Sequence, residues 1–213
     1  MDSDHRRSRQ DENAIGTVRP GIDDKLAWAD ENLDQSIARL FALVRIASIS
    51  TDPSYKPECR KAGQWLVDEL SALGFDASLR DTAGQPIVVA HYTPKDGTSV
   101  RHLLFYGHYD VQPADPLDKW ASQPFEPVRR TGEDGVERLY GRGVADDKGQ
   151  LMTFLEAARA WMATAGALPF RATFLIEGEE ESGSPSIVPF LEANAEELSC
   201  EAAFVCDTNM WDA

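Results

Sequence analysis

The sequence predicts an α/β fold in which a layered, mixed sheet is flanked by helices. Short apolar runs typical of strands alternate along the chain with longer segments in which apolar residues recur every three or four positions. That alternation is the pattern of a sheet covered by helices. Three of the apolar runs lead directly into acidic or imidazole side chains, at His108, Glu177 and Asp207. Ligands of an open α/β sheet bind beyond the carboxyl ends of its strands, so we expect the functional site there.

Helices are expected in four parts of the chain. The pattern turns helical at Asp23, and an apolar stripe then runs from Leu33 to Val44 at three- and four-residue spacing. A second helix is expected from about residue 57 to Gly74, since glycine commonly follows the last turn of a helix. Residues 147–162 and the short segment 185–191 complete the set.

Strands are expected between and after these helices. In chain order they cover residues 75–80, 86–92, 102–106, 170–176 and 202–206. The run at 102–106 is continuously apolar, which is typical of a strand buried on both faces. Residues 48–56, which include Pro53, and the proline-rich segment from 108 to about 130 are expected to be loops.

Composition limits the classes of partner. The chain of 213 residues has a formal net charge of −15. Nucleic-acid and anionic membrane surfaces attract basic proteins, so neither partner is expected. The three cysteines form no framework spacing and are expected to be reduced thiols of a cytoplasmic protein. The most apolar run, at 40–47, is interrupted by Arg45 and is shorter than the ~20 residues that a membrane span needs.

Residues 1–20 are polar and show neither helical nor strand periodicity. We expect them to form a flexible tail. They also lack the apolar stretch of a secretory signal. Residues 21–213 hold all of the periodic segments and are expected to contain the folded part of the chain.

His108 and Asp110 are the first candidate pair. Side chains two positions apart in extended backbone point the same way, so both can enter one site. Asp110 could hold the second ring nitrogen of a metal-bound His108, as carboxylates often do. The alternative is a histidine that is simply satisfied in the core or at the surface.

Asp146 lies in the glycine-punctuated segment Gly141–Gly149, which leads into an expected helix. One interpretation is a plain helix start, with Asp146 or Asp147 as the N-cap residue. A phosphate-binding loop is disfavoured, because adjacent aspartates would repel phosphate and the P-loop pattern is absent. The third interpretation is a carboxylate that bridges two cations.

Residues 177–181 contain four glutamates in five positions, directly after an apolar strand. Such a run is usually a solvated charged surface. Here a buried strand precedes it and the turn Ser182–Ser184 follows it, which favours carboxylates directed into a site. Asp207 adds a carboxylate at the next strand end. Imidazole with carboxylates favours Zn²⁺, with Mn²⁺ or Co²⁺ as alternatives.

These motifs resemble those of the M20 metallopeptidase family, which includes cytosolic dipeptidases, carnosinase-like enzymes, carboxypeptidase G and acyl-amino-acid deacylases. The matching stretches are Gly107–Pro113, Gly141–Gly149, Glu177–Ser184 and Val205–Asp207, in family order. The Gln112-Pro113 ending is similar to the dipeptidase and carnosinase branch. The resemblance implies a zinc-peptidase-like catalytic domain, of which residues 21–213 would be the N-terminal portion.

The resemblance also implies two divalent metal ions, most simply Zn²⁺. Carried over by motif, His108 and Asp207 would bind one ion, Asp146 would bridge both ions, and Glu181 would bind the second.

The remaining roles follow from the same resemblance. Glu180 would act as general base, and Asp110 would orient the metal-binding histidine. Alignment on Glu-Ser-Gly-Ser selects Glu180 and Glu181 over Glu179 and Glu180 as the working pair. The bond after the bridging aspartate is often cis in the family, which makes Asp146–Asp147 a candidate.

The activity implied is hydrolysis of amide bonds in dipeptides by metal-activated water. The alternatives are an N-acyl-amino-acid deacylase or desuccinylase of the same family, and a non-catalytic metal-binding fragment. Family members carry a second metal-binding histidine and a lid domain, and His5, His91 and His102 stand in the wrong places for that histidine. We therefore expect an incomplete domain without its lid, inactive on its own. The full-length enzyme would act on a small peptide or an acyl-amino acid, with a homodimer as one form.

Overall fold

The computed structural model describes residues 21–95 and 101–208, and the expected tail at 1–20 lies outside the described residues. The elements are α1 (Asp23–Glu31), α2 (Leu33–Val44), α3 (Lys56–Ala72), β1 (Asp76–Arg80), β2 (Ile87–Tyr92), β3 (His102–His108), β4 (Val128–Thr131), β5 (Glu137–Tyr140), α4 (Lys148–Ala165), β6 (Arg171–Glu177), α5 (Ile187–Ala193) and β7 (Ala202–Val205). Short 3-10 turns lie at Pro53–Tyr55, Leu117–Lys119 and Glu180–Ser182. Among the described residues, no helix combines the length and the apolar character needed to cross a bilayer.

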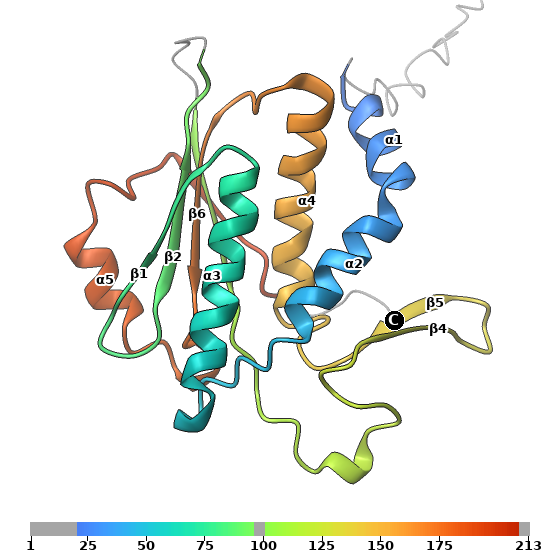
Figure 1. Cartoon of the computed structure of the whole chain (residues 1–213). Coiled ribbons are helices and arrows are strands. Elements are labelled where there is room, and N and C mark those ends of the chain that lie inside the picture. The colour runs from blue at the N-terminus through green and yellow to red at the C-terminus, as the bar shows by residue number, and fades with distance from the viewer. Residues whose placement is uncertain (1–20, 96–100, 209–213) are drawn as a thin grey trace, which may run out of the picture.

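A five-stranded mixed sheet forms the centre of the fold, in the order β1-β2-β6-β3-β7. Strand β3 is parallel to both of its neighbours, β6 and β7, whereas β1 pairs antiparallel with β2, and β2 antiparallel with β6. Because β6, β3 and β7 run in one direction, their carboxyl ends meet at the same edge of the sheet. The layered, mixed sheet flanked by helices that the sequence predicts is confirmed (Figure 1).

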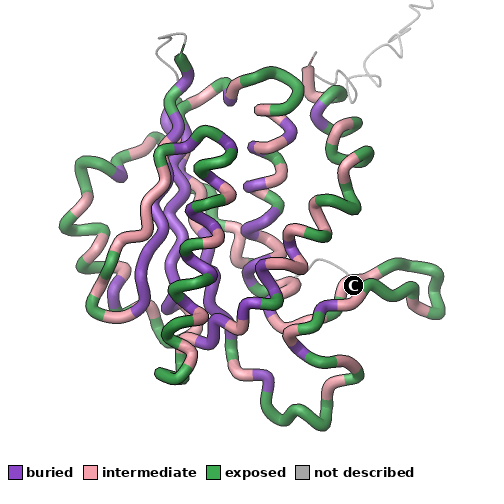
Figure 2. Tube along the Cα trace, viewed as in Figure 1, coloured by how far each residue is buried: buried purple, intermediate pink, exposed green. Residues whose placement is uncertain are grey.

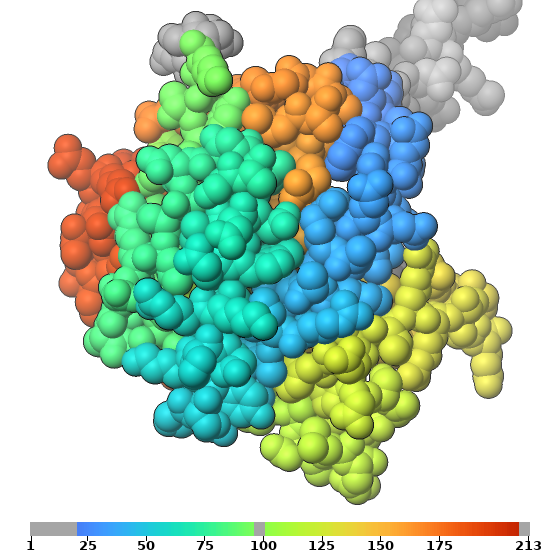
Figure 3. All heavy atoms as spheres, viewed as in Figure 1, coloured from blue at the N-terminus to red at the C-terminus, as the bar shows by residue number. Residues whose placement is uncertain are grey.

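Alternating side chains of the sheet supply two apolar layers. Val88 and Ala90 of β2 belong to the larger core cluster, which α2, α3 and α4 complete with residues such as Leu66. Ile87 and Val89, the alternate residues of the same strand, belong to a smaller cluster with the α5 region. Helices α3 and α4 lie in front of the sheet, α1 and α2 lie beside α4, and α5 lies at the left (Figure 1). In the space-filling view these helices cover much of the viewed face (Figure 3).

Aromatic stacking fixes the pairing of the parallel strands. Phe105 of β3 is paired in register with Phe174 of β6 and Phe204 of β7. Its ring centroid lies 5.3 Å from that of Phe174 and 5.5 Å from that of Phe204, both in stacked geometry. The same register places His108 opposite Glu177, so the strand ends are aligned where the site is expected.

The expected elements are present, with two differences. The helical segment expected from Asp23 is divided at Asn32 into α1 and α2, and the helix that ends before Gly74 is present with that glycine at a φ of +88°. The hairpin β4–β5 was not predicted, since the sequence suggested only a loop from 108 to about 130. Half of the residues in its strands are charged, most are exposed, and no apolar face alternates along them, so they appear largely green and pink in Figure 2.

Candidate metal centre

His108 is the centre of the site. It is the last residue of β3 and is fully buried. Its Nδ1 lies 3.2 Å from Asp110 Oδ1 and 3.1 Å from the Asp110 carbonyl oxygen. Both atoms are acceptors, so the proton of a neutral ring resides on Nδ1 and the lone pair is on Nε2. The ring therefore presents its metal-binding nitrogen to the opposite side, as expected for a metal-ligating histidine.

Three carboxylates approach Nε2 of His108 from separate segments. Asp146 Oδ1 lies at 3.1 Å, and both Glu180 Oε2 and Asp207 Oδ2 lie at 3.9 Å. Within residues 21–95 and 101–208, His108, Glu180 and Asp207 form the one group of three potential ligands whose ligand atoms all lie within 4.8 Å of one another. These residues lie at or just beyond the ends of β3, β6 and β7, and Asp146 precedes α4.

Asp110 connects the imidazole to the glutamate pair. Its carboxylate is fully buried. Besides its contact with His108, it accepts the backbone N–H of Glu180 at 3.2 Å through Oδ1 and that of Glu181 at 3.1 Å through Oδ2. The carboxylate thus fixes the end of β3 relative to the 3-10 turn that follows β6. The predicted role of orienting His108 is compatible with this geometry.

Glu181 faces a different partner from Glu180. Its Oε2 accepts a hydrogen bond from Gln112 Nε2 at 2.8 Å, and its carbonyl oxygen accepts a second one from the same nitrogen at 3.0 Å. Glu180 is the member of the pair within reach of His108 and Asp207. The division into a general base at Glu180 and a metal ligand at Glu181 stays a prediction.

The glutamate run is not a solvated surface throughout. Glu177 is 2% exposed and accepts the hydroxyls of Tyr106 at 2.6 Å and Ser184 at 3.0 Å. Burial raises the pKa of Glu177. Glu179 is also buried and lies against Gly84, where a Cβ would overlap its carboxylate. These two glutamates are buried parts of the turn, which leaves Glu180 as the member of the run within reach of His108 and Asp207.

The peptide bond between Asp146 and Asp147 is cis, as the family resemblance implied. The Asp146 side chain is exposed. Asp147 is fully buried, and its Oδ2 accepts the backbone N–H of His108 at 2.9 Å. Burial raises the pKa of Asp147 to about 7, because that hydrogen bond and the charge of His108 only partly offset it. Within the described residues its Oδ1 is buried without a hydrogen-bond partner.

The site has a negative potential that favours a cation. Burial lowers the pKa of His108, but the hydrogen bond and charge of Asp110, with the charges of Asp147 and Asp207, raise it to about 10. Burial raises the pKa of the Glu180 carboxyl. An imidazole nitrogen with several carboxylate oxygens is a donor set that suits Zn²⁺ or Mn²⁺. The residues present therefore fit a divalent cation.

Two residues that contact the site or its surroundings were not among the residues predicted from the sequence. Gln112 is two residues beyond Asp110, so the strand alternation that paired Asp110 with His108 could have found it. Lys148 is fully buried, and its Nζ donates to the carbonyl oxygens of Leu43 at 3.2 Å and Ile46 at 2.6 Å. These contacts hold the start of α4 against the end of α2, and no local sequence pattern predicts them.

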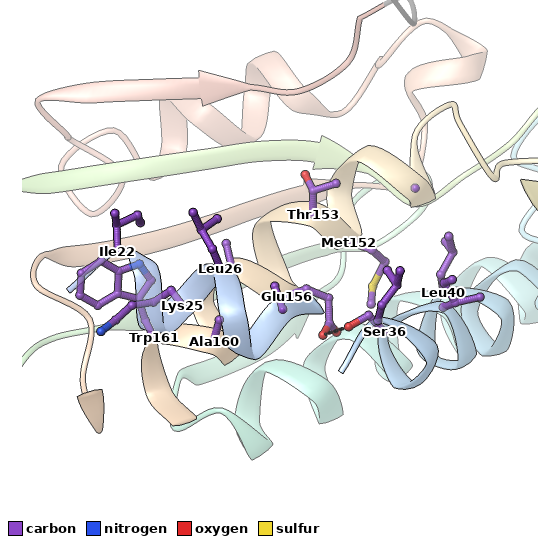
Figure 4. Close-up of a pocket in the computed structure, with 15 residues that line it drawn as sticks. Ile22, Lys25, Leu26, Ser36, Leu40, Met152, Thr153, Glu156, Ala160 and Trp161 are labelled. Carbon is purple, nitrogen blue, oxygen red and sulfur yellow. Dashed lines mark hydrogen bonds between the residues drawn. The ribbon is translucent and has the colours of Figure 1, made fainter. Parts of the chain in front are cut away.

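A separate apolar groove of about 420 Å³ lies between α1, α2 and α4. The side chain of Lys25 lies near Trp161 at one end, with its Nζ 4.8 Å from the ring centroid (Figure 4). None of the predicted site residues lines this groove. The candidate metal centre at the sheet edge and this apolar groove are therefore two separate places on the molecule.

The fold and the site together define an α/β protein with a carboxylate-rich centre for divalent cations. The family comparison agrees with that class. A model of peptidase family M20/M25/M40 matches residues 104–213, and the chain belongs to this family.

Relatives in sequence include two kinds of hydrolase. The Cys-Gly metallodipeptidase dug1 of Schizosaccharomyces pombe is 32% identical over 199 residues, which cover 89% of this chain and 40% of the relative. The succinyl-diaminopimelate desuccinylase of Burkholderia multivorans is 36% identical over 149 residues, which cover 68% of this chain and 38% of the relative. The chain thus spans about 40% of the length of these relatives.

Solved structures agree with the dipeptidase branch. Human carnosine dipeptidase 1 matches with a TM-score of 0.80 and 28% identity, over 89% of this chain and 41% of that chain. The dipeptidase Dug1p of Saccharomyces cerevisiae matches with a TM-score of 0.76 and 27% identity, over 88% of this chain and 41% of that chain.

Proposed function

We propose that the whole protein is a two-metal hydrolase that cleaves the peptide bond of dipeptides. The observation that carries this proposal is the arrangement around His108 Nε2, which lies 3.1 Å from Asp146 and 3.9 Å from Glu180 and from Asp207. One imidazole and three carboxylates, from the ends of β3, β6 and β7 and from the segment before α4, form a metal-binding constellation. Membership of the peptidase family directs it to amide hydrolysis.

Two divalent ions, most simply Zn²⁺, with Mn²⁺ or Co²⁺ as alternatives, would be held by four residues. His108 and Asp207 would hold the first ion, Asp146 would bridge the two, and Glu181 would hold the second. When bound, such ions supply Lewis-acid chemistry that activates water and polarises a carbonyl group.

The chain's own residues would do the remaining work. Glu180 would accept the proton of the attacking water and deliver it to the leaving amine, a role that suits a carboxylate within reach of the centre. Asp110 would keep the Nδ1 proton of His108 in place, so that Nε2 faces the site. Gln112 would hold the Glu181 carboxylate in position.

The substrate class is inferred from the relatives' names. Two of them are dipeptidases, one for Cys-Gly and one for carnosine, which supports small dipeptides. The desuccinylase relative favours a second candidate, an N-acyl-amino-acid deacylase. A non-catalytic metal-binding protein is the third candidate, and a base-positioned Glu180 argues against it. We further propose a cytoplasmic location and a homodimeric form of the whole protein.

Metal-dependent turnover by the whole protein tests this proposal. After chelation and readdition of Zn²⁺, Mn²⁺ or Co²⁺, hydrolysis of Cys-Gly, β-alanyl-histidine and N-succinyl amino acids would be compared. We expect dipeptide hydrolysis that chelation abolishes and metal restores, and its loss in Asp146→Ala but not in the exposed control Asp118→Ala. Hydrolysis of the N-succinyl substrates alone would instead establish the deacylase. Metal binding without hydrolysis of any substrate would contradict both.

A further inference from the structure

Gln150, in the first turn of α4, contacts the segment that carries Asp207. Its Oε1 accepts the backbone N–H and the hydroxyl of Thr208, both at 3.1 Å. The Cys206 thiol lies 3.8 Å from the same oxygen. These donors flank Asp207 on both sides, so a single acceptor holds the residues before and after this predicted ligand.

The other end of the same amide contacts the segment that carries Asp146. Gln150 Nε2 donates to the carbonyl oxygen of Ala145 at 3.4 Å, and Ala145 directly precedes Asp146. One side chain therefore joins the peptide units beside two predicted metal ligands. It needs both an acceptor and a donor to do so, and an amide supplies both.

The Asp207 segment has little else to fix it within the described part of the chain. All four residues of β7 are exposed. Among the described strands, β7 pairs with β3 alone and lies at the edge of the sheet. Past the end of β7, the hydrogen bonds of Thr208 among the described residues both go to Gln150. Among the described residues, this amide therefore contacts the chain on both sides of Asp207.

We propose that Gln150 is a positioning residue that sets the separation of Asp207 and Asp146, and thereby the affinity of the centre for its metal. This inference rests on the proposed function, because it concerns the same metal ligands. Residues that orient metal ligands typically contribute 10- to 100-fold in metal affinity. Gln150 would act through its hydrogen bonds alone, since no role in binding the metal or substrate is assigned to it.

The test compares three substitutions by Co²⁺ titration and amide hydrogen exchange. Gln150→Met keeps the length of the side chain and removes both hydrogen bonds. Gln150→Asn keeps the amide but is one methylene shorter, so it cannot reach both segments. Gln64→Met is the matched control, since Gln64 is exposed on α3 and bonds only Asp68 of the same helix, at 2.9 Å, among the described residues.

We expect Gln150→Met and Gln150→Asn to weaken Co²⁺ binding by about tenfold or more. Exchange of the Thr208 amide hydrogen should accelerate in both variants. Gln64→Met should retain the affinity and the exchange rate of the wild type. The free energy of unfolding without metal should be similar for the Gln150 and Gln64 variants, because a positioning role affects ligand geometry more than stability.

The outcomes separate the inference from the proposed function. Wild-type affinity in Gln150→Met, together with weak binding in Asp207→Ala, would overturn the role of Gln150 and leave the metal centre intact. A loss of Co²⁺ affinity accompanied by a large loss of unfolding free energy would show that Gln150 has a structural role instead. In that case Thr208→Val, which removes only the hydroxyl donor to Gln150, should leave the Co²⁺ affinity unchanged. Wild-type protein that binds no divalent ion would overturn the proposed function, and this inference with it.

Discussion

Asp110 shows how one buried carboxylate can connect several residues of a candidate site. It is fully buried and faces three donors, the His108 ring nitrogen and the backbone N–H groups of Glu180 and Glu181. In Asp110→Asn, an amide NH₂ would replace one of the two accepting oxygens, so a donor would face another donor. The histidine tautomer and the turn at Glu180 would both be affected, because they share the same carboxylate.

Asp110→Asn is therefore expected to weaken metal binding by about 10- to 100-fold, with a corresponding loss of turnover. The measurement is metal content after dialysis against a weak chelator, with kcat measured in excess metal. Asp118→Asn, an exposed change in the loop after β3, is the control and should behave as wild type. Unchanged metal affinity in Asp110→Asn would show that the contact with His108 Nδ1 does not orient the ring.

Glu180→Gln tests the general base. The amide keeps the shape of the side chain but cannot accept the proton, so kcat should fall by about 100-fold or more while the metal content is retained. Glu181→Gln should instead reduce the metal content. If Glu179→Gln lowers kcat and Glu180→Gln does not, the assignment along the glutamate run is displaced by one residue. The burial of Glu179 against Gly84 argues against that outcome.

The sequence-based site prediction depends most on strand geometry. His108, Asp110 and Asp207 lie at or just beyond strand ends. Side chains two positions apart on an extended segment share one face, and this spacing can be recognised in the sequence alone. Lys148 and Gln150 were not identified, because their partners include backbone atoms of segments distant in sequence. Backbone acceptors carry no residue signature, so contacts to them become evident only in the folded chain.

At the scale of elements, α4 has two tasks. Its first turn contacts the end of α2 through Lys148 and the segment after β7 through Gln150, and its middle packs into the core. Leu155 is fully buried there, in the cluster that α4 shares with α3 and the sheet. The hairpin β4–β5 is the opposite case, an exposed element that contributes little to the core. Helix α4 was predicted because its apolar stripe is strong, and the hairpin was missed because it has none.

Leu155→Ala is expected to lower the free energy of unfolding by about 2–5 kcal/mol, since it removes buried methyl groups and leaves a cavity. Urea unfolding monitored by circular dichroism measures this. Leu26→Ala on α1 is the matched control, because Leu26 is 57% exposed and its truncation should change stability by less than about 0.5 kcal/mol. Similar losses in both variants would show that α4 does not anchor the core.

At the scale of the whole molecule, a polar network centred on Thr173 crosses the sheet. Thr173 Oγ1 of β6 lies 2.9 Å from Nδ1 of His91 and 2.7 Å from Nε2 of His102. His91 Nε2 lies 2.8 Å from Glu197, which also binds both terminal nitrogens of Arg80. The network joins β1, β2, β6 and β3 to the segment after α5. It accounts for two histidines that are not placed to bind metal.

This network should make stability depend on acid pH. The hydrogen bonds of Arg80 lower the pKa of Glu197 to about 2, with His91 assisting and burial opposing. A carboxyl whose pKa is lower in the folded state stabilises the fold above its ordinary pKa and loses that effect as pH falls. The stability difference between wild type and Glu197→Gln should therefore be largest above the ordinary value of 4.5 and should shrink as the pH approaches about 2.

Chemical unfolding at several pH values measures this difference, with Glu196→Gln as the exposed neighbouring control. That control should differ little from wild type at every pH. A constant difference between wild type and Glu197→Gln from neutral pH to about pH 2 would show that Arg80 and His91 do not stabilise the ionised carboxylate.

The register of β3 links correct folding to the presence of reactive groups. Phe105 stacks on Phe174 in the same pairing that sets His108 opposite Glu177. Slippage by one residue would turn every β3 side chain to the other face of the sheet. Phe105 would then leave the core at the same moment that the His108 imidazole left its acidic neighbours. A mispaired molecule would thus be both unstable and chemically inert, so the fraction of a preparation able to take up metal would also measure its folding fidelity.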